Sequence, residues 1–187
     1  MSLSHITTDL IQHDAVRQAV DLVRDGSPAN IADFPDAAGP ALASALIREL
    51  ESSALIVTTR QDRADYLSIA LAEYLGTDYE VAVWNAPDAL PYEQLPNDLE
   101  AGVRRVQMLH RMRSRDTNRR VWVAPVNGLM QLLSPPAALA DMTLTLRLAS
   151  RQSVDDLHAW ATRVGYETSP IVQEPGTIAR RGGIVDI

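Results

Sequence analysis

Short apolar runs alternate with helical patterns through the middle of the chain. Residues 54–58, 79–84 and 121–124 are three such runs, and the first is continuous, as in strands buried on both faces. Between them, residues 62–75 and about 98–115 carry apolar side chains at helical spacing. This alternation predicts a parallel α/β sheet with right-handed crossovers.

Two further helices are predicted before the first strand. Residues 5–24 form an amphipathic pattern that ends at the Gly26-Ser27-Pro28 sequence, and residues 41–50 form a helix of small side chains. The segment 127–133 reads as a short helix closed by Pro135 and Pro136.

The pattern changes after Pro136. Residues 142–148 alternate between apolar side chains and Thr or Arg, which predicts a strand with one solvent-exposed face. Ser153 is placed to cap a helix over residues 153–164, with Asp155 and Asp156 in its first turn. Two extended runs follow, so this part predicts a small α+β subdomain in the order strand, helix, strand, strand.

These patterns divide the chain into three parts. We expect an N-terminal helix in residues 1–29, an α/β domain in residues 30–137, and the α+β subdomain in residues 138–187. The apolar run 184–187 ends the sequence without a cap or polar tail. We therefore expect the subdomain to be truncated and the chain to be a fragment of a larger protein.

Composition excludes several kinds of chemistry. All 17 basic residues are arginine, and the chain has no cysteine. A phosphate-binding P-loop and a Schiff base both require lysine, and a thiolate or Cys-ligated zinc requires cysteine. The four histidines are scattered, and no Ser/His/Asp order stands out. No catalytic residue, cofactor or metal is expected, and with no membrane segment or secretion signal we expect a cytoplasmic protein.

The densest basic region leaves two interpretations open. It contains seven arginines, while the whole chain carries a net charge of -7, which argues against nucleic acid as the main partner. A solvated helix face is the favoured interpretation, and a contact to DNA or to another domain is the alternative. The arginines are Arg104, Arg105, Arg111, Arg113, Arg115, Arg119 and Arg120.

The last 23 residues carry the most distinctive pattern. Gly165 ends a helix, an extended run continues to Gln173, and Pro175-Gly176 predicts a turn. The next extended run, 177–187, is interrupted by Gly182 and Gly183. Adjacent glycines in a strand indicate a bulge or a close approach of another backbone, or else an ordinary hairpin with a glycine bulge.

Several of these segments resemble the amino-terminal module of the bacterial transcription-repair coupling factors (Mfd), which is similar to a module of the repair protein UvrB. The resemblance covers nearly the whole chain from about residue 30. The matching segments are Leu90-Pro91-Tyr92-Glu93, Arg105, 123–129 (VAPVNGL), Gly165-Tyr166, and Pro175-Gly176 through Ile187, with its A-x-R-G-G-I-V-D-I pattern. Residues 96–98 depart from the serine-proline-histidine sequence usual in the family.

The resemblance implies a fold and a partner. The fold would be a degenerate P-loop helicase-like domain, UvrB domain 1a, and Gly39-Pro40 stands where an intact P-loop would need glycines and a lysine. The function would be a non-catalytic platform that recruits UvrA. RNA polymerase, DNA and the ATPase motor would belong to domains outside this chain.

The resemblance implies that four residues of the α+β subdomain, residues 138–187, contact UvrA. Arg181 aligns with the arginine before the glycine in the family pattern, and Gly182, Gly183 and Arg180 are its neighbours. The alternative for Arg181 is an internal ion pair with Asp186 or Glu174.

Two other functions remain as alternatives. One is a fragment of a nucleotide- or small-molecule-binding α/β enzyme related to UvrB helicase, with its pocket at 87–98 beside the carboxyl ends of the strands. The other is a structural spacer with no partner of its own.

Overall fold

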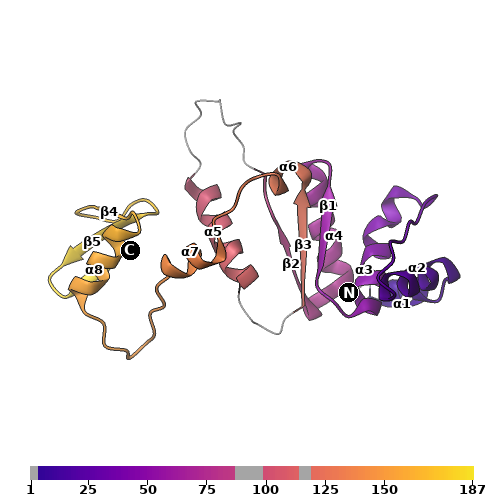
Figure 1. The fold of residues 1–187 in the computed structure, drawn as a ribbon, viewed down its shortest axis with the longest axis horizontal. Coiled ribbons are helices and arrows are strands. Elements are labelled where there is room, and N and C mark those ends of the chain that lie inside the picture. Colours follow the sequence, from indigo (N-terminus) through magenta and orange to yellow (C-terminus); the bar gives the residue numbers. More distant parts are fainter. Residues whose placement is uncertain (1–3, 87–98, 114–118) are drawn as a thin grey trace. The chain divides into compact units, whose positions relative to one another are not determined.

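The computed structural model describes residues 4–86, 99–113 and 119–187. The chain forms two compact units, which are described separately (Figure 1). Unit 1 comprises Met1–Asp88 and Arg115–Gln131, and unit 2 comprises Ala89–Ser114 and Leu132–Ile187. The domain boundaries expected from sequence remain a prediction.

Unit 1 is built from helices around a parallel sheet. Its elements are α1 (Ser4–Ile11), α2 (Asp14–Arg24), η1 (Asp36–Ala38), α3 (Gly39–Leu50), β1 (Ala54–Thr58), α4 (Gln61–Leu75), η2 (Gly76–Asp78), β2 (Tyr79–Val83), β3 (Arg119–Pro125) and α6 (Val126–Leu129). The strand order is β1-β3-β2, and both pairs are parallel. The predicted parallel α/β sheet is therefore confirmed, whereas its helicase-like character stays a prediction.

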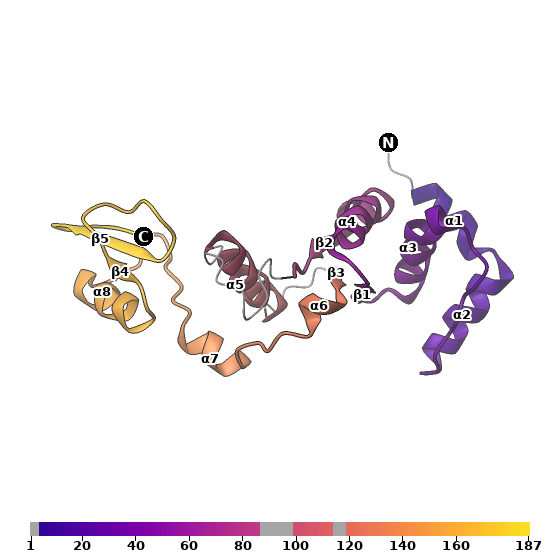
Figure 2. The ribbon, with the colours of Figure 1, turned by 90° about the horizontal axis from the view of Figure 1, so that it is seen from above.

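The core of unit 1 lies between the sheet and α3 and α4, and α4 runs along one side of the strands (Figure 2). Leu71 and Leu75 of α4 and Val121 and Val123 of β3 are fully buried there. The hydroxyl of Tyr79 donates to the backbone oxygen of Ile47, 3.2 Å away, and so satisfies its polar group inside the core.

The predicted single helix over residues 5–24 is wrong, because α1 and α2 are separate. Gln12 and His13 donate to the backbone oxygens of Asp9 and Leu10 and end α1, and His13 has the extended φ and ψ of −73° and 130°. Bending there buries Thr7 of α1 and Val20 of α2. The apolar periodicity runs through the bend, so it could not indicate the break.

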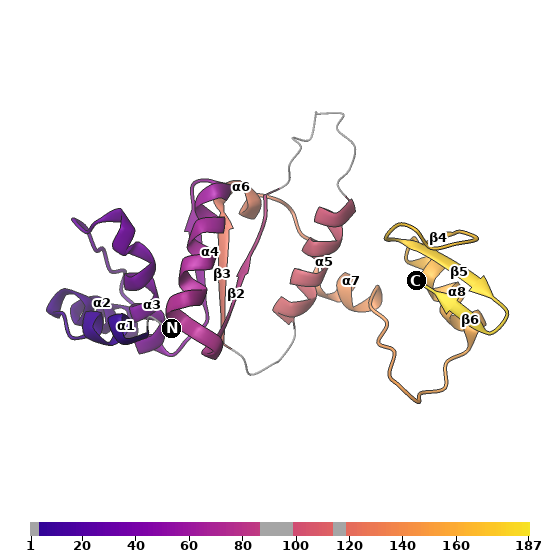
Figure 3. The ribbon, with the colours of Figure 1, turned by 180° about the vertical axis from the view of Figure 1, so that it is seen from behind.

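Unit 2 contains helices and a second sheet. Its elements are α5 (Leu99–Arg113), α7 (Pro136–Asp141), α8 (Val154–Arg163), β4 (Glu167–Thr168), β5 (Thr177–Arg181) and β6 (Ile184–Asp186). β4 pairs parallel with β5, and β5 pairs antiparallel with β6 (Figure 3). The hydroxyl of Ser153 accepts a hydrogen bond from the backbone N–H of Asp156, which confirms the predicted cap of α8.

Three sequence predictions for unit 2 need correction. Residues 142–148 do not form a strand, because no described strand pairs with them. The extended run before Gln173 contains only the short strand β4, since only two residues there find a strand partner. Gly182 and Gly183 form a turn between β5 and β6 instead of a bulge inside one strand, because Arg181 and Ile184 are register partners.

Some predicted features lie outside the described residues. They are the Leu90–Glu93 motif, Arg115, and the pocket expected at residues 87–98. Among the described helices, none is long and apolar enough to span a membrane.

Candidate partner-binding surface

The candidate surface is the hairpin formed by β5 and β6. Its register pairs Arg181 with Ile184 and Arg180 with Val185, which leaves Gly182 and Gly183 as a two-residue turn. Gly182 has a φ of +60°, and Gly183 does not have a positive φ. That combination is typical of a type II′ turn, whose first central position favours glycine.

Open space surrounds both turn glycines. A Cβ atom built at Gly182 or Gly183 would meet nothing within 4 Å. The requirement for glycine at position 182 is therefore conformational, and position 183 carries neither a conformational nor a steric requirement.

Arg180 lies on the face of β5 that packs against α8. Side chains alternate along a strand, so Arg180 shares its face with the fully buried Ile178. Its Nη1 lies 2.5 Å from Oδ1 of Asp155 in the first turn of α8. Its Nε also donates to the backbone oxygen of Gly182, at 3.4 Å. Arg180 thus joins the hairpin to the helix.

Arg181 lies on the opposite face, and its environment is different. Its Nη2 donates to the backbone oxygen of Pro170 at 3.4 Å. No carboxylate of the described residues forms an ion pair with it, so the internal pairing with Asp186 or Glu174 is not seen. A guanidinium has five N–H donors, and the bond to Pro170 uses one of them.

Two exposed isoleucines accompany Arg181. Ile184 is its cross-strand partner and is 66% exposed, and Ile171, which follows Pro170 in the chain, is 54% exposed. A cation with unused donors beside exposed apolar side chains is a combination that protein interfaces favour.

Sequence reasoning identified the two arginines but not the partners that distinguish them. Asp155 is 25 residues from Arg180, and Pro170 is 11 residues from Arg181. The alternation of side chains along β5 is the sequence signal that separates the two arginines.

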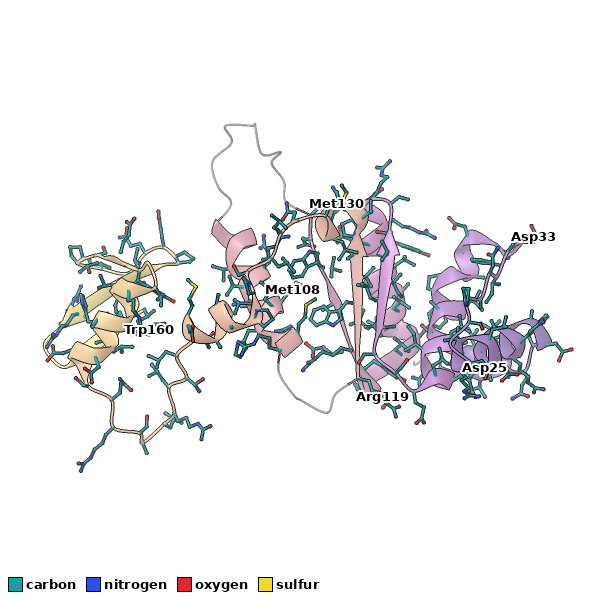
Figure 4. The ribbon with its side chains drawn as sticks, in the orientation of Figure 1. Asp25, Asp33, Met108, Arg119, Met130 and Trp160 are labelled. Carbon is teal, nitrogen blue, oxygen red and sulfur yellow. The ribbon has the colours of Figure 1, made fainter. Side chains whose placement is uncertain are left out.

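An aromatic pair supports the helix beside this hairpin. Trp160 of α8, labelled in Figure 4, and Tyr166 have ring centroids 5.9 Å apart with the rings tilted by 42°. Leu157 and Ala161 of the same helix are buried. α8 is therefore a packed helix, and the ion pair of Asp155 with Arg180 joins it to the hairpin.

Residues 39 and 40 of unit 1 stand where a P-loop would lie, but they do not have the geometry of a phosphate-binding loop. Gly39 is helical, with φ and ψ of −51° and −49°, and Pro40 follows it in the first turn of α3. Pro40 is buried and has no backbone N–H to donate to a phosphate. Within the described residues there is also no group of three His, Cys, Asp or Glu side chains that could hold a metal ion.

The two arginines that begin β3 are paired within unit 1. Nη2 of Arg119 lies 3.1 Å from Oε2 of Glu51, and Nε of Arg120 lies 3.0 Å from Oε2 of Glu80. A side-chain hydrogen bond with Tyr79 is the main cause that raises the pKa of Arg119, which Figure 4 labels. On α5, burial lowers the pKa of Arg105. The ion pairs with Glu51 and Glu80 favour a structural role for Arg119 and Arg120.

The fold defines a protein with a parallel α/β unit and a small mixed-sheet unit that presents an arginine on a hairpin. No protein-family model matches the chain. Curated relatives do match it, and they carry the name transcription-repair-coupling factor. The protein of Staphylococcus haemolyticus is 26% identical over 186 residues, which is 97% of this chain. That of Myxococcus xanthus is 25% identical over 175 residues, or 91% of this chain.

A third relative, from Haemophilus influenzae, is 28% identical over 148 residues, or 79% of this chain. The resemblance predicted from the sequence motifs is thus confirmed: the chain is similar to transcription-repair-coupling factors over most of its length. It spans 15%, 14% and 13% of the length of these three relatives.

Proposed function

We propose that this chain is the part of a transcription-repair coupling factor that docks UvrA, and that it acts without catalysis of its own. Similarity to the coupling factors over most of the chain supports its place in such a protein. The observation that carries the docking role is Arg181, exposed on the hairpin with unused donors beside Ile184.

Each residue of the hairpin has a role in this proposal. Arg181 binds a carboxylate of UvrA through two parallel N–H bonds, while its flat face packs on apolar atoms. Gly182 and Gly183 have no side chains, so a partner backbone can approach the turn closely. Arg180 is turned toward Asp155 and holds the hairpin on α8.

Titration of the chain with purified UvrA tests the proposal. We expect Arg181→Ala to weaken binding by about 2 kcal/mol or more, about 30-fold in Kd, as at other buried interface arginines. The melting temperature should change little, because the variant loses one long hydrogen bond to a carbonyl.

Arg180→Ala is the matched control for this experiment. Its ion pair with Asp155 is exposed, so its loss should cost the fold about 1 kcal/mol or less and should leave UvrA binding nearly unchanged. The proposal is wrong if Arg181→Ala binds UvrA as tightly as the parent chain, or if it loses binding only because unit 2 unfolds. A structural spacer would bind UvrA in neither form.

Absence of ATP binding is a separate expectation of the same proposal. The chain has no lysine, and Gly39-Pro40 lies inside a helix. Calorimetry with ATP and magnesium should therefore show no saturable heat. Binding tighter than about 100 μM, or about 5.5 kcal/mol, would favour the alternative of a nucleotide-binding enzyme fragment.

RNA polymerase and DNA enter the proposal only through the whole coupling factor. This chain spans 13 to 15% of the length of the three relatives described above. We assign the contacts to polymerase and DNA, and the ATPase motor, to parts of such a protein that the chain does not span.

A further inference from the structure

Two exposed isoleucines stand next to Arg181 in the fold. Ile184 is its cross-strand partner at the hairpin turn, and such partners have Cβ atoms about 4.5 to 5.5 Å apart. Nη2 of Arg181 donates to the carbonyl of Pro170, and Ile171 is the next residue. Ile184 is 66% exposed and Ile171 is 54% exposed. A single exposed isoleucine is ordinary on a protein surface, whereas two beside one guanidinium need an explanation.

The sheet order places these isoleucines on opposite sides of Arg181. β5 lies between β4 and β6, and Ile184 belongs to β6 (Figure 3). The loop that carries Ile171 begins at the end of β4, where Thr168 pairs with Ile178 of β5. The guanidinium of Arg181 therefore has an exposed apolar residue on the strand to one side and another on the loop to the other side.

The loop that carries Ile171 is held by hydrogen bonds within unit 2. The hydroxyl of Ser169 accepts from the N–H of Ile171, at 3.4 Å, and donates to its carbonyl oxygen, at 2.8 Å. At the other end of the loop, the hydroxyl of Thr177 donates to the carbonyl oxygen of Glu174, at 2.7 Å. Isoleucine also has few side-chain rotamers, because it is branched at Cβ. Binding at Ile171 therefore costs little further conformational entropy.

An exposed arginine by itself makes a weak anchor for a partner. An ion pair that water reaches changes an affinity by at most about 5-fold, because water screens the two charges. Interface arginines with larger effects lie where the surrounding contacts exclude water, since the attraction between charges grows as the effective dielectric constant falls. Ile184 and Ile171 are placed to provide this exclusion around Arg181.

We propose that Ile184 and Ile171 are anchors of the UvrA-docking surface together with Arg181, and that this surface binds an acidic side chain set between two apolar ones. The inference rests on the proposed function, because it specifies the partner chemistry of the same hairpin. The partner's carboxylate binds the guanidinium through parallel N–H bonds. Its apolar side chains cover the two isoleucines and exclude water from the ion pair.

Charge on the same face limits where the partner's acid lies. Asp186 shares the face of Ile184, two positions further along β6, and is exposed. A partner carboxylate is attracted to Arg181 and repelled by Asp186, so it lies toward the turn of the hairpin. Arg180 does not compete for it, because its guanidinium lies on the other face beside Asp155.

Calorimetric titration of the full 187-residue chain with purified UvrA tests this inference. We expect Ile184→Thr to raise Kd about 10-fold and Ile171→Thr to raise it by a similar factor, the loss expected when one large apolar side chain is no longer buried. Threonine keeps the branch at Cβ, and both positions are exposed, so both variants should stay folded. Circular dichroism and amide exchange of residues 177–186 check that they do.

Ile187→Thr is the matched control for these variants. Ile187 is 50% exposed and follows β6 directly, and alternation places it on the face opposite to Ile184. This variant should bind UvrA as tightly as the parent chain. An equal loss at position 187 would show that affinity follows exposed apolar area in general, and it would overturn the inference.

A double-mutant cycle measures whether Arg181 and Ile184 act as one site. Arg181→Ala alone should raise Kd about 30-fold, as described above, and Ile184→Thr about 10-fold. The double variant should lose clearly less than the product of about 300-fold, because the ion pair is already open to water once Ile184 is replaced. Losses that multiply in full would show two independent contacts and would overturn the inference.

These measurements separate the inference from the function on which it rests. If Arg181→Ala weakens binding while both threonine variants bind like the parent, the docking function stands and the inference is wrong. If the parent chain does not bind UvrA, or Arg181→Ala binds as tightly as the parent, the proposed function fails and the inference fails with it. Analytical ultracentrifugation of the chain alone tests a second copy as the occupant, and self-association that Ile184→Thr abolishes would also overturn the inference.

Discussion

Arg48 shows how one side chain can join two elements. It lies on α3, and its Nη2 donates to the backbone oxygens of Leu75, at 2.6 Å, and Tyr74, at 3.3 Å, in the last turn of α4. The last carbonyls of a helix have no partner within that helix and carry partial negative charge. Arg48 therefore caps α4 from a neighbouring helix, while its Nη1 lies 3.4 Å from Oδ2 of Asp78.

We predict that Arg48→Ala lowers the free energy of unfolding by about 2 kcal/mol, because two charge-assisted hydrogen bonds to carbonyls are lost in a partly buried site. Urea denaturation followed by circular dichroism measures this change. Arg24→Ala is the matched control, since Arg24 makes an exposed pair with Glu49 and its loss should cost about 1 kcal/mol or less. Equal costs for the two variants would show that Arg48 does not cap α4.

Arg180 and Arg181 also show that the partner of an arginine depends on the direction in which its side chain points. They are adjacent in sequence, yet one pairs with Asp155 of α8 and the other reaches only the carbonyl of Pro170. The difference arises because successive side chains of a strand point to opposite faces. Arg180 is therefore bound to another element of the fold, whereas Arg181 has N–H donors that the described residues do not use.

At the scale of elements, the hairpin turn depends on one of its two glycines. Gly182→Ala should destabilise unit 2 by about 1 to 2 kcal/mol, because a Cβ disfavours a positive φ. Gly183→Ala should change its stability by less than about 0.5 kcal/mol, since Gly183 has no positive φ and a Cβ there meets no atom. Native-state amide exchange of residues 177–186, which lie in unit 2, compares the two, and a larger loss at position 183 would contradict the type II′ assignment.

The start of α8 provides a second test at this scale. Ser153→Ala should cost about 1 kcal/mol, because its hydroxyl accepts from the N–H of Asp156. Ser153→Asp should retain the stability, since aspartate caps a helix about as well as serine. Denaturant titration of unit 2 distinguishes these outcomes. A loss as large for Ser153→Asp as for Ser153→Ala would mean that the hydroxyl is not acting as a cap.

At the scale of the whole molecule, the candidate surface lies entirely in unit 2, whereas the parallel sheet lies in unit 1. Leu71→Ala should cost unit 1 about 2 to 5 kcal/mol, because Leu71 is completely buried and its loss leaves a cavity. Ile69→Ala on the same helix should cost much less, because Ile69 is mostly exposed. At a temperature where both variants are folded, UvrA binding should equal that of the parent chain; weaker binding by Leu71→Ala would place a contact in unit 1.

Local patterns in the sequence determined much of this protein by themselves. The apolar runs at residues 54–58, 79–84 and 121–124 predicted three parallel strands, and Ser153 with the acidic residues after it predicted the cap of α8. The family motifs predicted the similarity to the coupling factors. These features depend on neighbouring residues, so their signals are contained in short stretches of sequence.

Tertiary structure decided what depends on distant residues. α1 and α2 both pack against α3, on either side of the bend between them, and Arg180 and Arg181 find their partners Asp155 and Pro170 at distant positions in the sequence. Residues 142–148 alternate between apolar and polar side chains as a strand does. Such alternation predicts which side chains would share a face, but it does not predict whether another strand lies alongside to pair with them. Strand formation requires backbone hydrogen bonds to another strand, and no described strand pairs with this segment.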